Sequence, residues 1–204
     1  MTTPRRRTGS EAASLAEELA AAVDAYRHDD NLGTLFDRLR ALAVTAEPVE
    51  LSAAAEPYRD LPEVVIPLYE HIVAARPADA PAMVLLANAY WVSGRGPNVV
   101  GELASRAMAV DPANRGAWHL WALTESRVRE RVARWQQVAD RFPADQLARA
   151  ALADNAASLA GAEHDPLALD LAITTYEGLL AESTEPGQRQ ALEAAIKTLR
   201  GWRL

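Results

Sequence analysis

The chain has 204 residues, half of them hydrophobic, and a formal net charge of −7. This length suffices for one compact domain or one short solenoid, and the acidic balance argues against sequence-independent binding of nucleic acid, which relies on neutralising phosphates. No apolar run approaches the roughly 20 residues of a membrane span. The absence of cysteine removes disulfides and cysteine-bound metals. We therefore expect a cytoplasmic protein that binds neither nucleic acid nor membranes.

Residues 1–10 are polar and carry Arg5, Arg6 and Arg7 without a periodic apolar pattern, which predicts a disordered tail. Beyond this tail, apolar residues recur at steps of three and four, the spacing that places them on one face of a helix. No stretch alternates with the period of a strand, so the chain is predicted to be all-α, with about 10–11 helices. Helices are expected over 11–27, 32–45, 80–93, 98–110, 115–127, 131–141, 144–160, 167–181 and 186–200, and 49–55 is consistent with a further short helix.

The proline-rich stretch 46–67 leaves two alternatives open. Asp60 and Glu63 have the spacing of a capping box, which predicts a helix that runs on to Ala75. Pro67 would then lie inside this helix and bend it, because proline lacks the N–H that the preceding turn needs. In the alternative, the helix begins only at Pro67, since the residue before a proline disfavours helical geometry.

One short phrase occurs three times in the middle of the chain. The copies are Pro77-Ala78-Asp79, Pro112-Ala113-Asn114 and Pro143-Ala144-Asp145. They lie 35 and 31 residues apart, a period typical of solenoid repeats, in which each unit buries its apolar face against its neighbours. In each copy the proline ends one helix pair, and the Asp or Asn is expected to cap the next helix. The predicted organisation is an N-terminal helical cap over 11–60 and a repeat array over 61–204 that ends in a capping helix.

The best-preserved unit, residues 80–114, resembles the tetratricopeptide repeat. The matching positions hold Leu86, Ala87, Tyr90, Val100, Ala104, Ala107 and the closing Asp111-Pro112. The units that follow keep fewer of these positions, so the repeats are degenerate, and the resemblance covers about residues 61–200. It implies a right-handed α-solenoid of antiparallel helix pairs and carries over no catalytic residues.

The same resemblance implies a concave groove, lined by the first helix of each pair, which binds a peptide or a helix of a protein partner. The candidate partner-binding residues are Val84, Asn88, Trp91, Val92, His119, Leu123, Arg127, Arg131 and Asp154. Asn88 stands where chaperone-binding members place an amide that grips a terminal carboxylate. Val84 stands where those members have a lysine, which argues against a carboxylate clamp in this chain.

Four arginines form a basic run within an otherwise acidic chain: Arg127, Arg129, Arg131 and Arg134. One interpretation is a patch that attracts an acidic segment of a partner. The other is a solvated helix face, partly neutralised by a pair between Glu130 and Arg134 one helical turn apart.

The histidines do not form a metal-binding pattern, and no cofactor is expected. They are His28, His71, His119 and His164. The leading hypothesis is a non-catalytic scaffold or adaptor for a protein or peptide partner. The alternative is a structural subunit of a larger complex or a homo-oligomer, for which Trp202 and Leu204 would provide an apolar end. An enzyme that uses His28 or His164 with the adjacent acid is the least favoured hypothesis.

Overall fold

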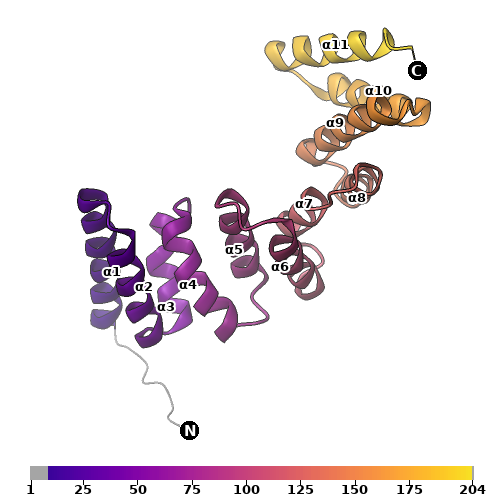
Figure 1. Ribbon diagram of the computed structural model, residues 1–204. Coiled ribbons are helices and arrows are strands. Elements are labelled where there is room, and N and C mark those ends of the chain that lie inside the picture. Colours follow the sequence, from indigo (N-terminus) through magenta and orange to yellow (C-terminus); the bar gives the residue numbers. More distant parts are fainter. Residues whose placement is uncertain (1–8, 204) are drawn as a thin grey trace. The chain divides into compact units, whose positions relative to one another are not determined.

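The computed structural model describes residues 9–203, so residues 1–8 of the tail predicted over 1–10, and Leu204, lie outside the described part of the chain (Figure 1). The described residues form α-helices and one short 3-10 helix, with no strand among them, which confirms the all-α prediction. The elements are α1 (Gly9–Asp29), α2 (Leu32–Thr45), α3 (Pro48–Ala55), η1 (Glu56–Tyr58), α4 (Pro62–Ala75), α5 (Ala80–Val92), α6 (Pro97–Val110), α7 (Arg115–Leu123), α8 (Val128–Arg141), α9 (Gln146–Glu163), α10 (Pro166–Glu182) and α11 (Pro186–Arg200). Helix α1 therefore begins two residues before the expected start at residue 11.

The chain divides into two compact units, Met1–Leu120 and Trp121–Leu204, and the boundary falls within α7. In the first unit, successive helices from α1 to α6 pack in order, and α1 also contacts α3 while α2 contacts α4. The largest fully buried side chains of this unit are Leu15, Leu19, Val23, Leu35, Leu39, Leu51, Val64, Val65, Leu68, Ile72, Met83 and Val100. This arrangement is the nearest-neighbour packing of a repeat array.

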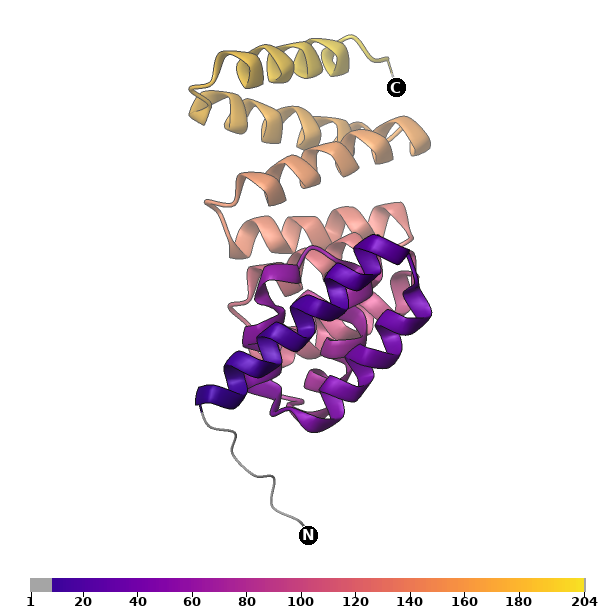
Figure 2. The same ribbon diagram turned by 90° about the vertical axis from the view of Figure 1, so that its left-hand side faces the viewer.

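In the second unit, α8, α9, α10 and α11 pack in chain order, and Figure 2 shows α9, α10 and α11 side by side. Arg149 of α9 donates two hydrogen bonds to the carboxylate of Glu182 at the end of α10. Trp202 lies against Gly161 of α9. The contact is so close that a Cβ atom added at Gly161 would lie only 3.3 Å from the Trp202 ring. Trp202, which the sequence suggested as part of an apolar end, thus contacts its own chain and still has 38% of its surface exposed.

The repeated phrase caps helices, as predicted. The Asp79 carboxylate accepts a hydrogen bond from the Ala82 N–H at 3.0 Å, and the Asn114 amide oxygen accepts one from the Ala117 N–H at 3.1 Å. The Asp145 carboxylate accepts from two backbone N–H groups in the first turn of α9. Each phrase therefore satisfies first-turn N–H groups that have no partner within the helix itself.

The predicted capping box at Asp60 is wrong. Helix α4 begins at Pro62, its N-cap residue is Leu61, and no side chain bonds to the free N–H groups of its first turn. The helix continues through Pro67 to Ala75, which settles the alternative left open by the sequence. Proline at the first helical position needs no N–H partner, so Pro62 can start the helix without a side-chain cap.

Other helix boundaries also differ from the expectation, including the start of α8, which is Val128 rather than residue 131. Helix α7 ends at Leu123 rather than near residue 127, because the Trp121 carbonyl oxygen is taken up by the Thr124 hydroxyl and the Arg134 guanidinium. Helix α9 continues to Glu163, so Gly161 is helical rather than part of the expected loop at 161–165. Because glycine has no side chain, Gly161 leaves room for the Trp202 ring to approach the helix closely, and it does not break the helix.

Candidate protein-binding groove

A surface cavity of about 250 Å³ lies between the segment that joins η1 to α4 and the exposed side of α5. We call it the α5 groove, and it is lined by Arg59, Asp60, Pro62, Leu85, Asn88, Ala89 and Val92. Every lining residue belongs to the first unit. Pro62 fixes the start of α4 and Asp79 fixes the start of α5, so both walls are set by the ends of capped or proline-initiated helices.

The groove combines an apolar wall with a few polar groups. Leu85 and Ala89 lie one turn apart on α5, and Val92 continues the same face with 69% of its surface exposed. The Asn88 side chain is exposed and makes no hydrogen bond to any described residue, so its amide is available both as a donor and as an acceptor. The Arg59 guanidinium is already paired with Glu56 at 2.9 Å. The groove therefore offers apolar contact with one free amide beside it.

Trp91 does not line the groove, but it precedes Val92 on α5 and has 39% of its surface exposed. It is followed by a sharp turn in which Gly94 and Gly96 have φ angles of 75° and 94°, values that favour glycine. Two of the four candidate residues predicted on α5, Asn88 and Val92, line the groove. The fourth, Val84, is half-buried, and its methyl group would lie 3.0 Å from a Cβ added at Gly116 of α7.

The remaining candidate residues do not line this groove. His119 is half-buried on α7 in the first unit, whereas Leu123 at the end of α7 belongs to the second unit and is exposed. Asp154 of the second unit accepts a hydrogen bond from the Tyr176 hydroxyl, and burial together with this contact raises the pKa of Tyr176. The Asp154 carboxylate is therefore already engaged within its own unit.

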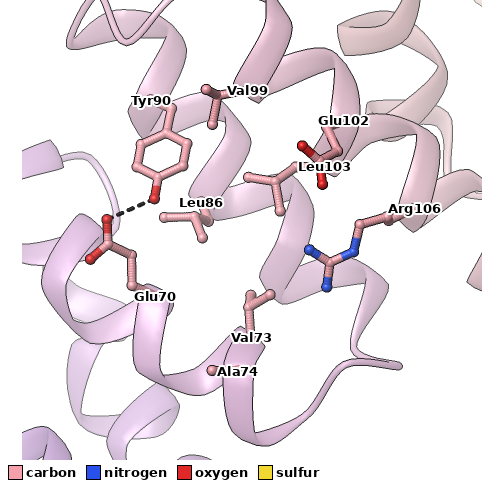
Figure 3. A pocket seen from close by; sticks show the side chains of 9 residues that line it. All are labelled: Glu70, Val73, Ala74, Leu86, Tyr90, Val99, Glu102, Leu103 and Arg106. Atoms are coloured by element: carbon pink, nitrogen blue, oxygen red, sulfur yellow. Dashed lines mark hydrogen bonds between the residues drawn. The ribbon is translucent and has the colours of Figure 1, made fainter.

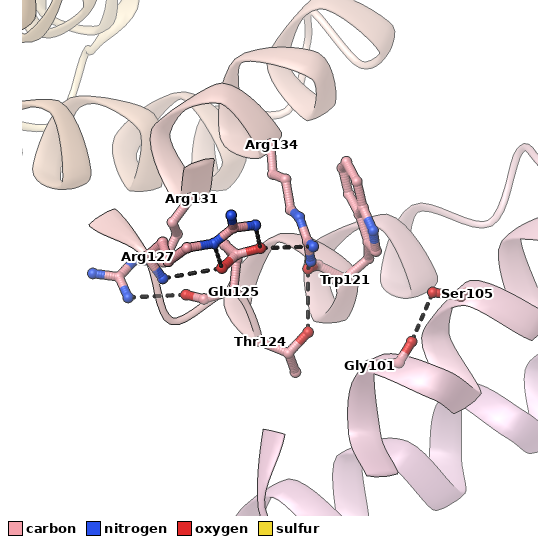
Figure 4. Close-up of polar contacts among 8 residues, drawn as sticks. All are labelled: Gly101, Ser105, Trp121, Thr124, Glu125, Arg127, Arg131 and Arg134. Carbon is pink, nitrogen blue, oxygen red and sulfur yellow. Dashed lines mark hydrogen bonds and ion pairs between the residues drawn. The ribbon is translucent and has the colours of Figure 1, made fainter. Parts of the chain in front are cut away.

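The arginines of the basic run make hydrogen bonds and ion pairs with other residues of the second unit, several of which Figure 4 shows. Arg131 donates to the Asn155 side-chain oxygen at 2.6 Å and to the Glu125 carbonyl oxygen at 3.1 Å. Arg129 pairs with Glu163 at 2.5 Å and with Asp165 at 3.0 Å. Contact with these acceptors favours a structural role for the run over a free basic patch.

Glu125 is the buried acid at the centre of this network, with 7% of its side chain exposed. It accepts a hydrogen bond from the backbone N–H of Arg127 at 3.0 Å, and its carboxylate lies 2.8 Å from the Arg134 guanidinium. The backbone hydrogen bond from Arg127, followed by the side-chain hydrogen bond from the same residue, lowers the pKa of Glu125 to about 2. The predicted pair between Glu130 and Arg134 is replaced by the pair between Glu125 and Arg134.

Sequence reasoning missed both Glu125 and the part of the α5 groove contributed by Arg59, Asp60 and Pro62. The local pattern at Asp60 indicates a helix cap, and nothing in it places the η1–α4 segment beside α5. Glu125 lies where the helix was expected to continue to residue 127. The earlier end of α7 at Leu123 is what turns its carboxylate toward the arginines.

The two histidines of the enzyme hypothesis lie at helix ends. His28 is exposed near the end of α1, and His164 ends α9 in the left-handed conformation with a φ of 54°. The acid that follows His164, Asp165, caps α10 through the Leu167 and Ala168 N–H groups. Within residues 9–203, no group of three or more His, Asp or Glu side chains is arranged to hold a metal ion. The described helices include none that is both long and apolar enough to cross a membrane.

No protein-family model matches the chain, and no curated protein matches it either. Solved structures do resemble it. The crystal structure of MamA aligns with a TM-score of 0.56 at 15% identity, over 76% of this chain and 92% of that one. TTC0263, a thermophilic TPR protein in Thermus thermophilus, aligns with a TM-score of 0.54 at 17% identity, over 91% of this chain and 98% of that one. The MamA RS-1 ArsTM double mutant aligns with a TM-score of 0.56 at 13% identity, over 84% of this chain and 98% of that one.

These alignments agree with the burial of the repeat positions that the sequence matched. Those side chains, Leu86, Ala87, Tyr90, Val100, Ala104 and Ala107, are all at most 9% exposed. Small residues such as Ala87 and Ala107 let neighbouring helices approach closely, while the larger ones fill the space between them. The fold is a tetratricopeptide-like α-solenoid built from antiparallel helix pairs.

Proposed function

We propose that the protein is a non-catalytic scaffold that binds a short segment of another protein in the α5 groove. The observation that carries this proposal is the coincidence, on one face of α5, of the groove with the exposed Val92 side chain and the unpaired Asn88 amide. Apolar side chains of a soluble protein gain free energy when a partner covers them. A free amide beside them can bond to the backbone of an extended segment.

Trp91 adds an anchor at the end of this face. Tryptophan is enriched among the residues that contribute most to binding, because its large ring buries much surface at little cost in conformational entropy. The ring is only partly covered by its own chain, so further burial by a ligand is available. The segment that binds here is therefore expected to present at least one apolar side chain to Val92 and Trp91.

The proposal is tested by selecting short peptides from a random displayed library with the full-length protein. The selection includes a counter-step against Val92→Asp, which places a charge on the apolar wall. The recovered peptides are then measured against the unmodified chain, Val92→Asp, and Asn88→Ala combined with Trp91→Ala. Val44→Asp is the matched control, because Val44 is 78% exposed on α2 and does not line the groove.

We expect the recovered peptides to bind the unmodified chain and Val44→Asp alike. Both groove variants should bind about tenfold more weakly or worse, the usual cost of losing one anchor residue. Failure to enrich any peptide, or equal affinity for Val92→Asp, would overturn the assignment of the groove. Circular dichroism of each variant ensures that a lost affinity does not reflect a lost fold.

A further inference from the structure

A second cavity of the first unit, of about 290 Å³, opens between α4 and α6 and is floored by α5 (Figure 3). We call it the α4–α6 cavity. It uses Leu86 and Tyr90 of α5, whereas the α5 groove uses Leu85, Asn88 and Val92. With about 3.6 residues per turn, these two sets lie on different faces of the helix. The cavity is therefore separate from the proposed groove, and what it binds is a separate question.

The cavity is lined by two carboxylates, Glu70 and Glu102, and one guanidinium, Arg106, so its formal charge is −1. Glu70 of α4 is exposed, and its carboxylate accepts a hydrogen bond from the Tyr90 hydroxyl at 2.7 Å. No described cationic group lies within ion-pair distance of Glu70. Arg95 lies over the Tyr90 ring, 5.3 Å from its centroid, and does not pair with this carboxylate. A neutral phenol thus holds a charged group in position while leaving its charge unpaired.

The other charged groups of the cavity can compensate each other. Glu102 and Arg106 lie one turn apart on α6, with the acid on the N-terminal side, the favoured order for such a pair. Figure 3 shows both on the α6 side of Leu103, away from Glu70. One negative charge therefore remains in excess in the cavity, and Glu70 is the carboxylate that lies away from Arg106 (Figure 3).

The floor between these charges is apolar. Val73 of α4, Leu86 of α5 and Leu103 of α6 converge there, with Glu70 at one edge (Figure 3). Pockets for drug-sized ligands have volumes of roughly 300–1,000 Å³, so this cavity lies at the lower end of that range and has room for one long side chain. Arginine and lysine have the matching shape, because each carries a long aliphatic stem that covers apolar surface and a charged head at its end.

We infer that the α4–α6 cavity binds a single arginine or lysine side chain of a partner polypeptide, with the stem over Leu86 and Leu103 and the cationic head at Glu70. This site would add a charge-selective contact to the apolar contact proposed for the α5 groove. It does not depend on that groove, since the two cavities share no lining residue.

The test uses the full-length chain and three matched tripeptides, acetyl-Ala-X-Ala-amide, in which X is arginine, norleucine or glutamate. Binding is followed by the NMR shifts of the Val73, Leu86 and Leu103 methyl groups. Glu70→Gln removes the charge and keeps the shape of the side chain. Glu17→Gln is the matched control, because it removes one exposed negative charge on α1, outside the cavity.

We expect the arginine peptide to shift these methyl groups in a saturable way, and Glu70→Gln to weaken its binding about three- to fivefold, as for the loss of an accessible ion pair. Glu17→Gln should leave the affinity unchanged, and added salt should weaken it. Three outcomes would overturn the inference: no saturable shift, equal binding of the norleucine or glutamate peptide, or equal effects of the two variants. Shifts of the Asn88 and Val92 signals report the α5 groove instead, so failure at one site is distinguished from failure at the other.

Discussion

The guanidinium of Arg134 lies 4.6 Å from the centroid of the Trp121 ring and at the same time donates a hydrogen bond to the Trp121 carbonyl oxygen at 2.7 Å. Its other nitrogen pairs with the buried carboxylate of Glu125. One side chain of α8 thus closes the end of α7 in three ways (Figure 4). The planar, forked guanidinium suits this combination, whereas a lysine ammonium can serve only part of it.

Arg134→Lys should therefore destabilise the protein even though the charge is kept. The loss of one hydrogen bond and of the stacking on Trp121 is expected to cost about 1–2 kcal/mol. Urea unfolding followed by circular dichroism measures this cost. Arg38→Lys is the control, because Arg38 makes no ion pair or hydrogen bond within the described residues. Equal stability of the two variants would show that the contacts around Trp121 contribute nothing.

The low pKa of Glu125 predicts a contribution to acid stability. Its pKa in the folded protein is about 2, below the ordinary value of 4.5, so folding favours the ionised form. This contribution is fully present above the unfolded pKa and is lost as the pH falls from about 4.5 toward 2. We expect Glu125→Gln to be less stable at pH 7, and the difference from the unmodified chain to shrink over this pH window. A difference that stays constant from pH 7 to pH 2 would contradict the assignment.

The repeated phrase predicts which acids matter for helix capping. Asp79→Ala removes the acceptor for the Ala82 N–H and should cost about 1 kcal/mol of stability. Asp79→Asn should cost less, because Asn114 performs the same capping in the middle copy of the phrase, and the remaining cost is the loss of the ion pair with Arg76 at 3.0 Å. Asp60→Ala should change stability by less than about 0.5 kcal/mol, since no side chain caps α4. Thermal unfolding of the three variants orders them, and a larger loss for Asp60→Ala than for Asp79→Ala would refute this account.

Alkaline conditions test the hydrogen bond between Tyr90 and Glu70. Burial first, and then the bond to Glu70, raise the pKa of Tyr90 from 10.0 to about 12. Because the folded state favours the neutral phenol, the associated stability is fully present below pH 10 and is lost between pH 10 and pH 12. Tyr90→Phe should lose about 0.5–1.5 kcal/mol at pH 7 and show a flatter decline over this window. If the stability of Tyr90→Phe fell as steeply between pH 10 and pH 12 as that of the unmodified chain, the loss of stability would come from a group other than Tyr90.

Much of the fold was predictable because its signals are local. Asp79, Asn114 and Asp145 each follow a helix-ending proline, and capping depends only on the next three residues. The site was less predictable because it depends on contacts between distant segments. Nothing near Asp60 indicates that it faces α5, and nothing near Gly161 indicates that the Trp202 ring lies against it.

The role of the basic run was also not predictable from the sequence, because it depends on contacts between helices. Its four arginines stand close together in the sequence, and charge alone allowed either a binding patch or a solvated face. The partners that engage two of them, Asn155 for Arg131 and Glu163 for Arg129, lie on the next helix, α9. A sequence pattern cannot pair residues across helices until the turn between them is known, and here that turn depended on the early end of α7.

The most direct test of the proposed scaffold function maps a selected peptide onto the full-length chain by the chemical-shift changes of its backbone amide and methyl signals. We predict that the largest changes fall on Leu85, Asn88 and Val92 of α5, and that Val92→Asp abolishes them while Val44→Asp preserves them. Largest changes on helices that do not line the α5 groove, with Val92→Asp binding unchanged, would contradict the proposal.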